Sequence, residues 1–100
     1  MKHFYAGTFM NREELKNVGI DYPIKLEYYK TKELEEAEET FGIEVVKTSY
    51  IHDKVATENV KIESLTKEEP IINTILDTLK KNEVTPINAT YIVEDLLKVI

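Results

Sequence analysis

The stretch of sequence that decides the fold is residues 41–65, which read FGIEVVKTSYIHDKVATENVKIESL. Apolar residues recur there at every second position, which is the period of a β-strand rather than that of a helix. Between two such runs lies the short polar segment His52-Asp53-Lys54, which is typical of a tight turn. Residues 41–51 and 55–65 are therefore expected to form an antiparallel hairpin.

The apolar residues of the first run change face midway. They are Phe41, Ile43 and Val45 on one side and then Val46, Thr48 and Tyr50 on the other. This switch predicts either a β-bulge or a strand that is buried on both faces. The second run keeps its alternation, because Lys61 and Glu63 interleave with Val60 and Ile62.

The sheet is expected to extend upstream, over residues 22–29 and less clearly over residues 3–10. The apolar residues that alternate in the first of these segments are Tyr22, Ile24, Leu26 and Tyr28. Residues 11–18 carry the signals of a short helix or a turn, with Asn11 as N-cap, Glu14 three residues later and Gly19 as a stop. Five glutamates between positions 33 and 39 predict a solvated loop over residues 31–40, with at most transient helix.

From residue 65 onward the apolar period becomes that of a helix. Thr66 and Glu69 have the spacing of a capping box, and Pro70 falls in the first turn, where its missing N–H is tolerated. The apolar stripe that follows consists of Ile71, Ile72, Ile75, Leu76 and Leu79. These signals predict an amphipathic helix that covers the sheet.

A second helix is expected from Pro86 to about Lys98, with Thr85 as its N-cap. One side of this helix is apolar and is predicted to face the core. It comprises Ala89, Ile92, Val93, Leu96, Leu97, Val99 and Ile100. Ile87 and Tyr91 fall instead on the polar side.

These patterns together predict an α+β fold: an antiparallel meander sheet of three to four strands, followed by two C-terminal helices packed on one face. A chain of 100 residues with 42% hydrophobic and 32% charged residues is expected to be one domain, residues 1–100. The absence of cysteine excludes disulfide frameworks, Cys-ligated zinc sites and thiol nucleophiles. No window is apolar enough for a signal peptide or a membrane span, which favours the cytoplasm.

The titratable residues form no recognisable catalytic or metal-binding pattern. The two histidines, His3 and His52, have no partner at ligand spacing, and the three glycines are too far apart for a phosphate-binding loop. The net charge is −6, and the lysines are interleaved with acids, so nucleic-acid binding is not expected. The sequence therefore predicts no enzyme activity, no metal and no cofactor.

The remaining interpretation is a small non-catalytic binding or regulatory protein that acts through protein–protein contacts. The predicted binding residues are Ile87 and Tyr91, one helical turn apart, with Glu94 and Asp95 beside them. Either another segment of the chain covers this pair, or a partner does: another protein or a second copy of the chain. Two alternatives stay open, namely an enzyme or metal-binding accessory whose site is not visible in the sequence, and an acidic mimic of nucleic acid that uses residues 33–39.

Three segments of the chain carry a resemblance to a known family. They are Phe41-Gly42-Ile43-Glu44-Val45, the turn His52-Asp53-Lys54-Val55, and the tail from Val84-Thr85-Pro86-Ile87 to Val93-Glu94-Asp95-Leu96. Over residues 22–98 the chain resembles a small family of unknown function from spore-forming Gram-positive bacteria. It departs from the family pattern at Asn88, where the family has His, and at Tyr91, where the family has an acidic residue. The resemblance implies the same fold and a cytoplasmic setting, and it implies no activity.

Overall fold

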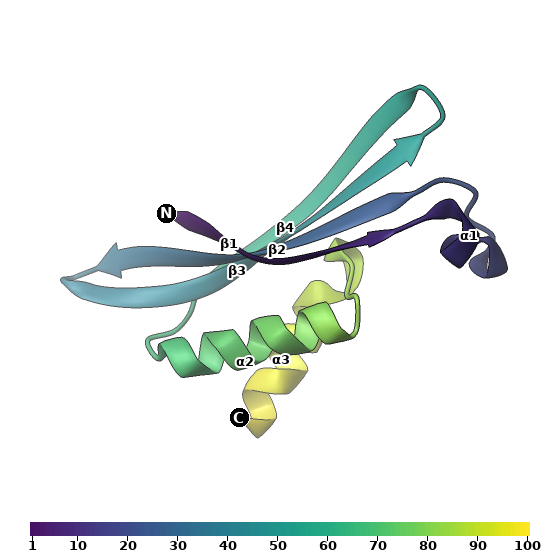
Figure 1. Cartoon of the computed structure of the whole chain (residues 1–100). Coiled ribbons are helices and arrows are strands. Elements are labelled where there is room, and N and C mark those ends of the chain that lie inside the picture. Colours follow the sequence, from purple (N-terminus) through teal and green to yellow (C-terminus); the bar gives the residue numbers. More distant parts are fainter.

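The computed structural model describes residues 1–100 as one open sheet with two long helices beneath it (Figure 1). The elements are β1 (Lys2–Met10), α1 (Arg12–Leu15), the 3₁₀ helix η1 (Lys16–Val18), β2 (Ile24–Glu35), β3 (Glu38–Ile51), β4 (Lys54–Thr66), α2 (Glu69–Lys81) and α3 (Pro86–Val99). The four strands pair antiparallel in the order β1-β2-β3-β4. The predicted α+β fold, a meander sheet followed by two C-terminal helices, is therefore confirmed.

The β3–β4 hairpin has the register that its sequence predicts. Ile51 pairs with Lys54, so the turn is His52-Asp53, and His52 adopts a left-handed backbone conformation with a φ of 53°. At the N-terminal end of the chain, the side chain of Asn11 accepts a hydrogen bond from the backbone N–H of Glu14 at 2.9 Å. Residues 11–18 thus form one capped α-helical turn followed by a 3₁₀ turn, which ends at Gly19 with a φ of 82°.

The core lies between the sheet and the two helices. Its members from the strands are Ile24, Leu26, Tyr28, Phe41, Ile43 and Val45, and its members from α2 and α3 are Ile72, Ile75, Leu76, Leu79, Ala89 and Val93. The hydroxyl of Tyr28 donates a hydrogen bond to the carbonyl of Val84 at 2.8 Å, and burial raises the pKa of this tyrosine. On the other side of the sheet no helix or loop is packed (Figure 1), so the molecule has a covered face and an outer face.

The expectation of a solvated loop over residues 31–40 is wrong. β2 and β3 continue to a two-residue turn at Glu36 and Ala37, whose φ angles of 48° and 67° match a type I′ hairpin. Repulsion among the glutamates is offset by lysines, since the Lys32 Nζ lies 3.2 Å from Glu39 Oε2 and Lys67 forms an ion pair with Glu38. The backbone N–H and C=O groups of residues 31–40 therefore find their hydrogen-bond partners within the sheet, although the composition of this segment is typical of a loop.

The predicted capping box at Thr66 and Glu69 is also wrong. Thr66 is the last residue of β4, and its hydroxyl oxygen accepts a hydrogen bond from the backbone N–H of Glu68, which is the N-cap of α2. The carboxylate of Glu69 instead bonds the Lys30 ammonium of β2 at 2.8 Å, and this cation lowers the pKa of Glu69. The partner of Glu69 is therefore a lysine of the sheet, and not the nearby N-cap of the helix that the sequence spacing suggests.

The apolar side predicted for α3 is only partly buried. Ala89 and Val93 are buried, whereas the exposed fractions of Leu97, Val99 and Ile100 are 37%, 80% and 49%. The physical reason is position, because the last turn of α3 runs away from the sheet toward the C-terminus (Figure 1). The core contribution of the helix therefore comes from Ala89 and Val93, with Ile92 and Leu96 partly buried against them, and not from its last turn.

Candidate interaction surfaces

The residues predicted as a binding site lie together on the side of α3 that faces away from the sheet. Ile87 and Tyr91 are 72% and 71% exposed, so no other segment of the chain covers them. Glu94 and Asp95 follow along the same side of the helix and are also exposed. Lys98 lies 4.0 Å from Asp95 and not beside Glu94. We call these four residues, Ile87, Tyr91, Glu94 and Asp95, the α3 stripe.

A second exposed apolar surface lies on the outer face of the sheet, where sequence reasoning predicted no site. The rings of Phe4 and Tyr29 meet edge to face with 5.7 Å between their centroids, and Phe4 and Phe9 are 61% and 56% exposed. Between these two phenylalanines lies an open groove of about 430 Å³ over Gly7. We call it the aromatic groove, and its lining residues are Phe4, Gly7, Thr8, Phe9, Lys25 and Glu27.

A β-bulge in β1 creates the aromatic groove. Five positions separate Phe4 from Phe9, so a regular strand would place them on opposite faces. The register between β1 and β2 slips by one residue between Phe4 and Ala6, which brings both phenylalanines to the outer face. The extra residue, Tyr5, turns toward α2, where its hydroxyl donates a hydrogen bond to Asp77 at 2.7 Å. This bond raises the pKa of Tyr5 to about 12.

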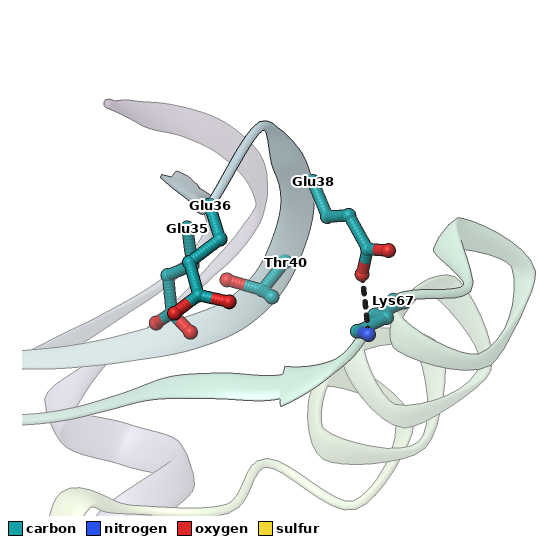
Figure 2. Close-up of a pocket in the computed structure, with 5 residues that line it drawn as sticks. All are labelled: Glu35, Glu36, Glu38, Thr40 and Lys67. Carbon is teal, nitrogen blue, oxygen red and sulfur yellow. Dashed lines mark ion pairs between the residues drawn. The ribbon is translucent and has the colours of Figure 1, made fainter.

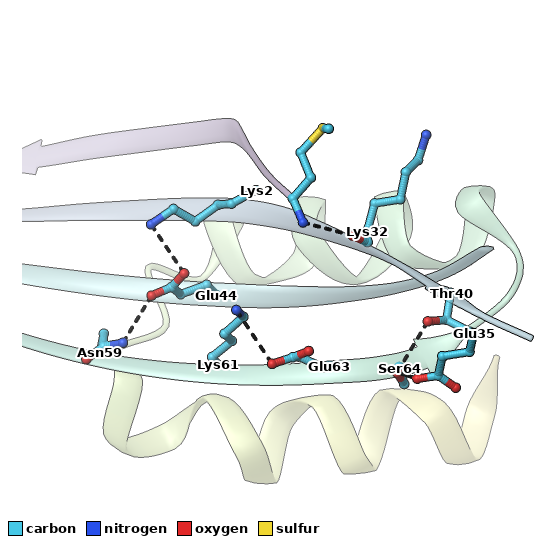
Figure 3. Close-up of polar contacts among 10 residues, drawn as sticks. Lys2, Lys32, Glu35, Thr40, Glu44, Asn59, Lys61, Glu63 and Ser64 are labelled. Carbon is cyan, nitrogen blue, oxygen red and sulfur yellow. Dashed lines mark hydrogen bonds and ion pairs between the residues drawn. The ribbon is translucent and has the colours of Figure 1, made fainter.

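A chain of polar contacts crosses the outer face beside the aromatic groove (Figure 3). The Glu44 carboxylate of β3 lies 3.3 Å from the Lys2 ammonium of β1 and accepts a hydrogen bond from Asn59 of β4 at 3.0 Å. Glu44 is only 8% exposed, and the Lys2 ammonium also lies 4.5 Å from the ring centroid of Tyr29. Because each of these groups already has a partner, the arrangement ties three strands together.

The tip of the β2–β3 hairpin encloses a polar cavity of about 610 Å³ (Figure 2). It is lined by Glu35, Glu36, Glu38, Thr40 and Lys67. The Lys67 ammonium lowers the pKa of the Glu38 carboxyl, and that carboxylate in turn raises the pKa of Lys67. Nearby, the Ser64 hydroxyl bonds the carboxylate of Glu35 and lies 3.2 Å from the Thr40 hydroxyl. These contacts hold the tip against the end of β4 and the segment that leads into α2.

Neither histidine lines any of these surfaces. His3 is exposed on β1, and His52 is exposed in the turn between β3 and β4. No three acidic or histidine side chains come together in an arrangement that could hold a metal ion. None of the helices combines the length and the apolar character that crossing a membrane requires.

The fold and these surfaces define a small α+β domain, a four-stranded open meander covered on one face by two helices, with exposed apolar groups on both α3 and the outer face. The chain belongs to a family of unknown function, DUF6514, whose family model matches residues 8–99. The expectation of an uncharacterised family is therefore confirmed. Neither the curated proteins nor the solved structures contain a match to the chain.

Proposed function

We propose that this chain is a small non-catalytic binding protein that holds another protein against the α3 stripe. The observation that carries the proposal is the exposure of Ile87 and Tyr91, at 72% and 71%, on a helix whose opposite side is anchored in the core. An aromatic and an aliphatic side chain one turn apart have the geometry by which helices present anchors to a groove of a partner.

The energetics favour burial of Ile87 and Tyr91 against a partner. Complete burial of an Ile side chain contributes about 1.5–3 kcal/mol, and aromatic anchors are enriched among the residues that dominate binding energy. Glu94 and Asp95 put negative charge next to the pair in a chain of net charge −6. A partner with an apolar pocket and basic side chains at its rim would be complementary in both shape and charge.

The proposed setting is the cytoplasm of a spore-forming Gram-positive bacterium, which follows the resemblance carried by residues 22–98. Such cells are the source of lysate for identifying the partner. The tagged full chain is expected to capture a protein that the Tyr91→Ala variant does not capture. The matched control is Val55→Ala, which removes an apolar side chain that is 65% exposed on β4.

Stability measurements separate binding from folding in this experiment. Since Tyr91 makes little contact within the chain, Tyr91→Ala is expected to leave the urea midpoint nearly unchanged. Equal capture by the wild type and by Tyr91→Ala would refute the proposal. A loss of more than about 2 kcal/mol of stability would refute it as well, because that loss is typical of a buried aromatic residue.

A further inference from the structure

The two edges of the sheet differ in how they are protected against pairing with another strand. β4, at one edge, carries Lys54, Glu58, Lys61 and Glu63, and its ladder to β3 is interrupted by a bulge near Ser64. Charged side chains along an edge strand are a usual means of avoiding further pairing, whereas a bulge is present in both β4 and β1 and does not distinguish them. The charged side chains of β4 therefore protect this edge against pairing with a further strand.

β1, at the other edge, has a different composition. Its nine residues contain no acidic side chain and no proline, and its only basic side chains, Lys2 and His3, lie at its beginning. Phe4 and Phe9 project from its outer face with more than half of each side chain exposed. Ala6 and Gly7 lie between them, and their small size leaves little steric bulk in the middle of the strand. β1 therefore combines an open backbone edge with exposed aromatic groups.

We infer that β1 pairs antiparallel with β1 of a second copy of this chain, about a two-fold axis through Gly7. In this register Phe4 of each copy lies opposite Phe9 of the other. Tyr5, the extra residue of the bulge, stays unpaired in both copies, so Ala6 lies opposite Thr8 on the core side and the two Gly7 residues meet on the outer face. The result is a continuous eight-stranded sheet whose outer face carries the aromatic groove of both copies side by side.

Charge supports a second copy as the occupant. Because the chain has a net charge of −6, most of its surface repels another copy, and β1 is the one strand without acids. Antiparallel pairing also brings the positive start of β1, with the N-terminal ammonium and Lys2, close to α1 of the other copy. α1 carries Glu13 and Glu14 together with Arg12, so its net charge is negative. The two-fold axis repeats this contact, so opposite charges meet at both ends of the interface.

Sedimentation of the full chain over a dilution series tests the inference. The wild type is expected to sediment at twice 11.6 kDa at high concentration and to approach 11.6 kDa on dilution. Phe4→Lys alone and Phe9→Glu alone should each shift the chain to the monomer at every concentration. The double variant should recover the dimer, because the introduced lysine and glutamate face each other across the axis. This recovery is specific to the proposed register.

Two controls separate the interface from other surfaces. Val55→Lys introduces the same charge on the outer face at the far edge of the sheet and should leave the dimer intact. Tyr91→Ala should also leave the dimer intact, so this experiment tests the dimer independently of the proposed function of the α3 stripe. Hydrogen exchange of the wild type gives a readout without substitutions, since the amides of residues 2–10 should exchange more slowly as concentration rises.

Four outcomes would overturn the inference. One is a wild-type chain that remains at 11.6 kDa throughout the series. Another is exchange of residues 2–10 that does not depend on concentration. The third is a dimer that persists in both single variants, which would place the contact between copies elsewhere. Binding of an unrelated extended peptide to β1 of a monomeric chain would likewise replace the second copy as occupant.

Discussion

At Gly42 the backbones of neighbouring strands come so close that no side chain fits. A Cβ atom there would lie 2.2 Å from the carbonyl oxygen of Ile62 and 2.7 Å from the hydroxyl oxygen of Thr31. The carbonyl belongs to the bulged part of β4, where three residues oppose Gly42 alone. Glycine is therefore needed at position 42 because the backbones of β3 and β4 approach closely, and not because of an unusual backbone angle. It allows the bulge of β4 to fold over the outer face.

Gly42→Ala is expected to destabilise the protein by about 1–3 kcal/mol, because the added methyl group must displace backbone rather than a flexible side chain. Gly7→Ala is the matched control. At Gly7 the nearest atoms, the carbonyl oxygen of Leu26 and the ring of Phe4, both lie at 3.3 Å, so a methyl group needs a shift of only a few tenths of an ångström. Urea denaturation of both variants measures the difference. Equal midpoints for the two would contradict the close approach of β4.

Among the elements, those governed by local chemistry follow from the sequence. The β3–β4 hairpin and α3 were both predictable, because alternation, a polar turn and a Thr-Pro start act within a few residues. The β2–β3 hairpin was not predictable, because its glutamates are neutralised by Lys67, which lies far along the chain. The aromatic groove was missed for a similar reason, since a bulge at Tyr5 reverses the faces that alternation assigns. Spacing alone carries no sign of that bulge.

The left-handed turn of the β2–β3 hairpin can be tested by substitution. Ala37 has a φ of 67°, in the left-handed region that costs residues with a Cβ about 1–2 kcal/mol. Ala37→Gly is therefore expected to stabilise the protein by about 0.5–1 kcal/mol. Ala56→Gly makes the same change at an exposed position within β4 and should destabilise by a similar amount. Thermal or urea unfolding that moves both variants in the same direction would rule out the left-handed turn.

Across the whole molecule, one face of the sheet carries the core while the other is available for contacts. The chain extends over 46 × 27 × 17 Å, because both long hairpins continue beyond the helices (Figure 1). Only the middle of the sheet is covered, so stability depends on a few fully buried side chains of α2 and their contacts with β2 and β3. The α3 stripe and the outer-face side chains Phe4 and Phe9 lie outside that region, which leaves them free to change without loss of the fold, whereas Tyr5 and Met10 of β1 pack against the core.

A pair of identical substitutions tests this division. Leu76 of α2 is completely buried in the core, whereas Leu34 near the β2–β3 turn is 73% exposed. Leu76→Ala is expected to cost about 2–5 kcal/mol through lost burial and the cavity that remains. Leu34→Ala removes the same atoms from a position already in contact with water, so its urea midpoint should stay close to that of the wild type. Similar losses for the two variants would mean that the helices do not cover the sheet as described, since only a packed layer above the strands makes one leucine costly to truncate and leaves the other neutral.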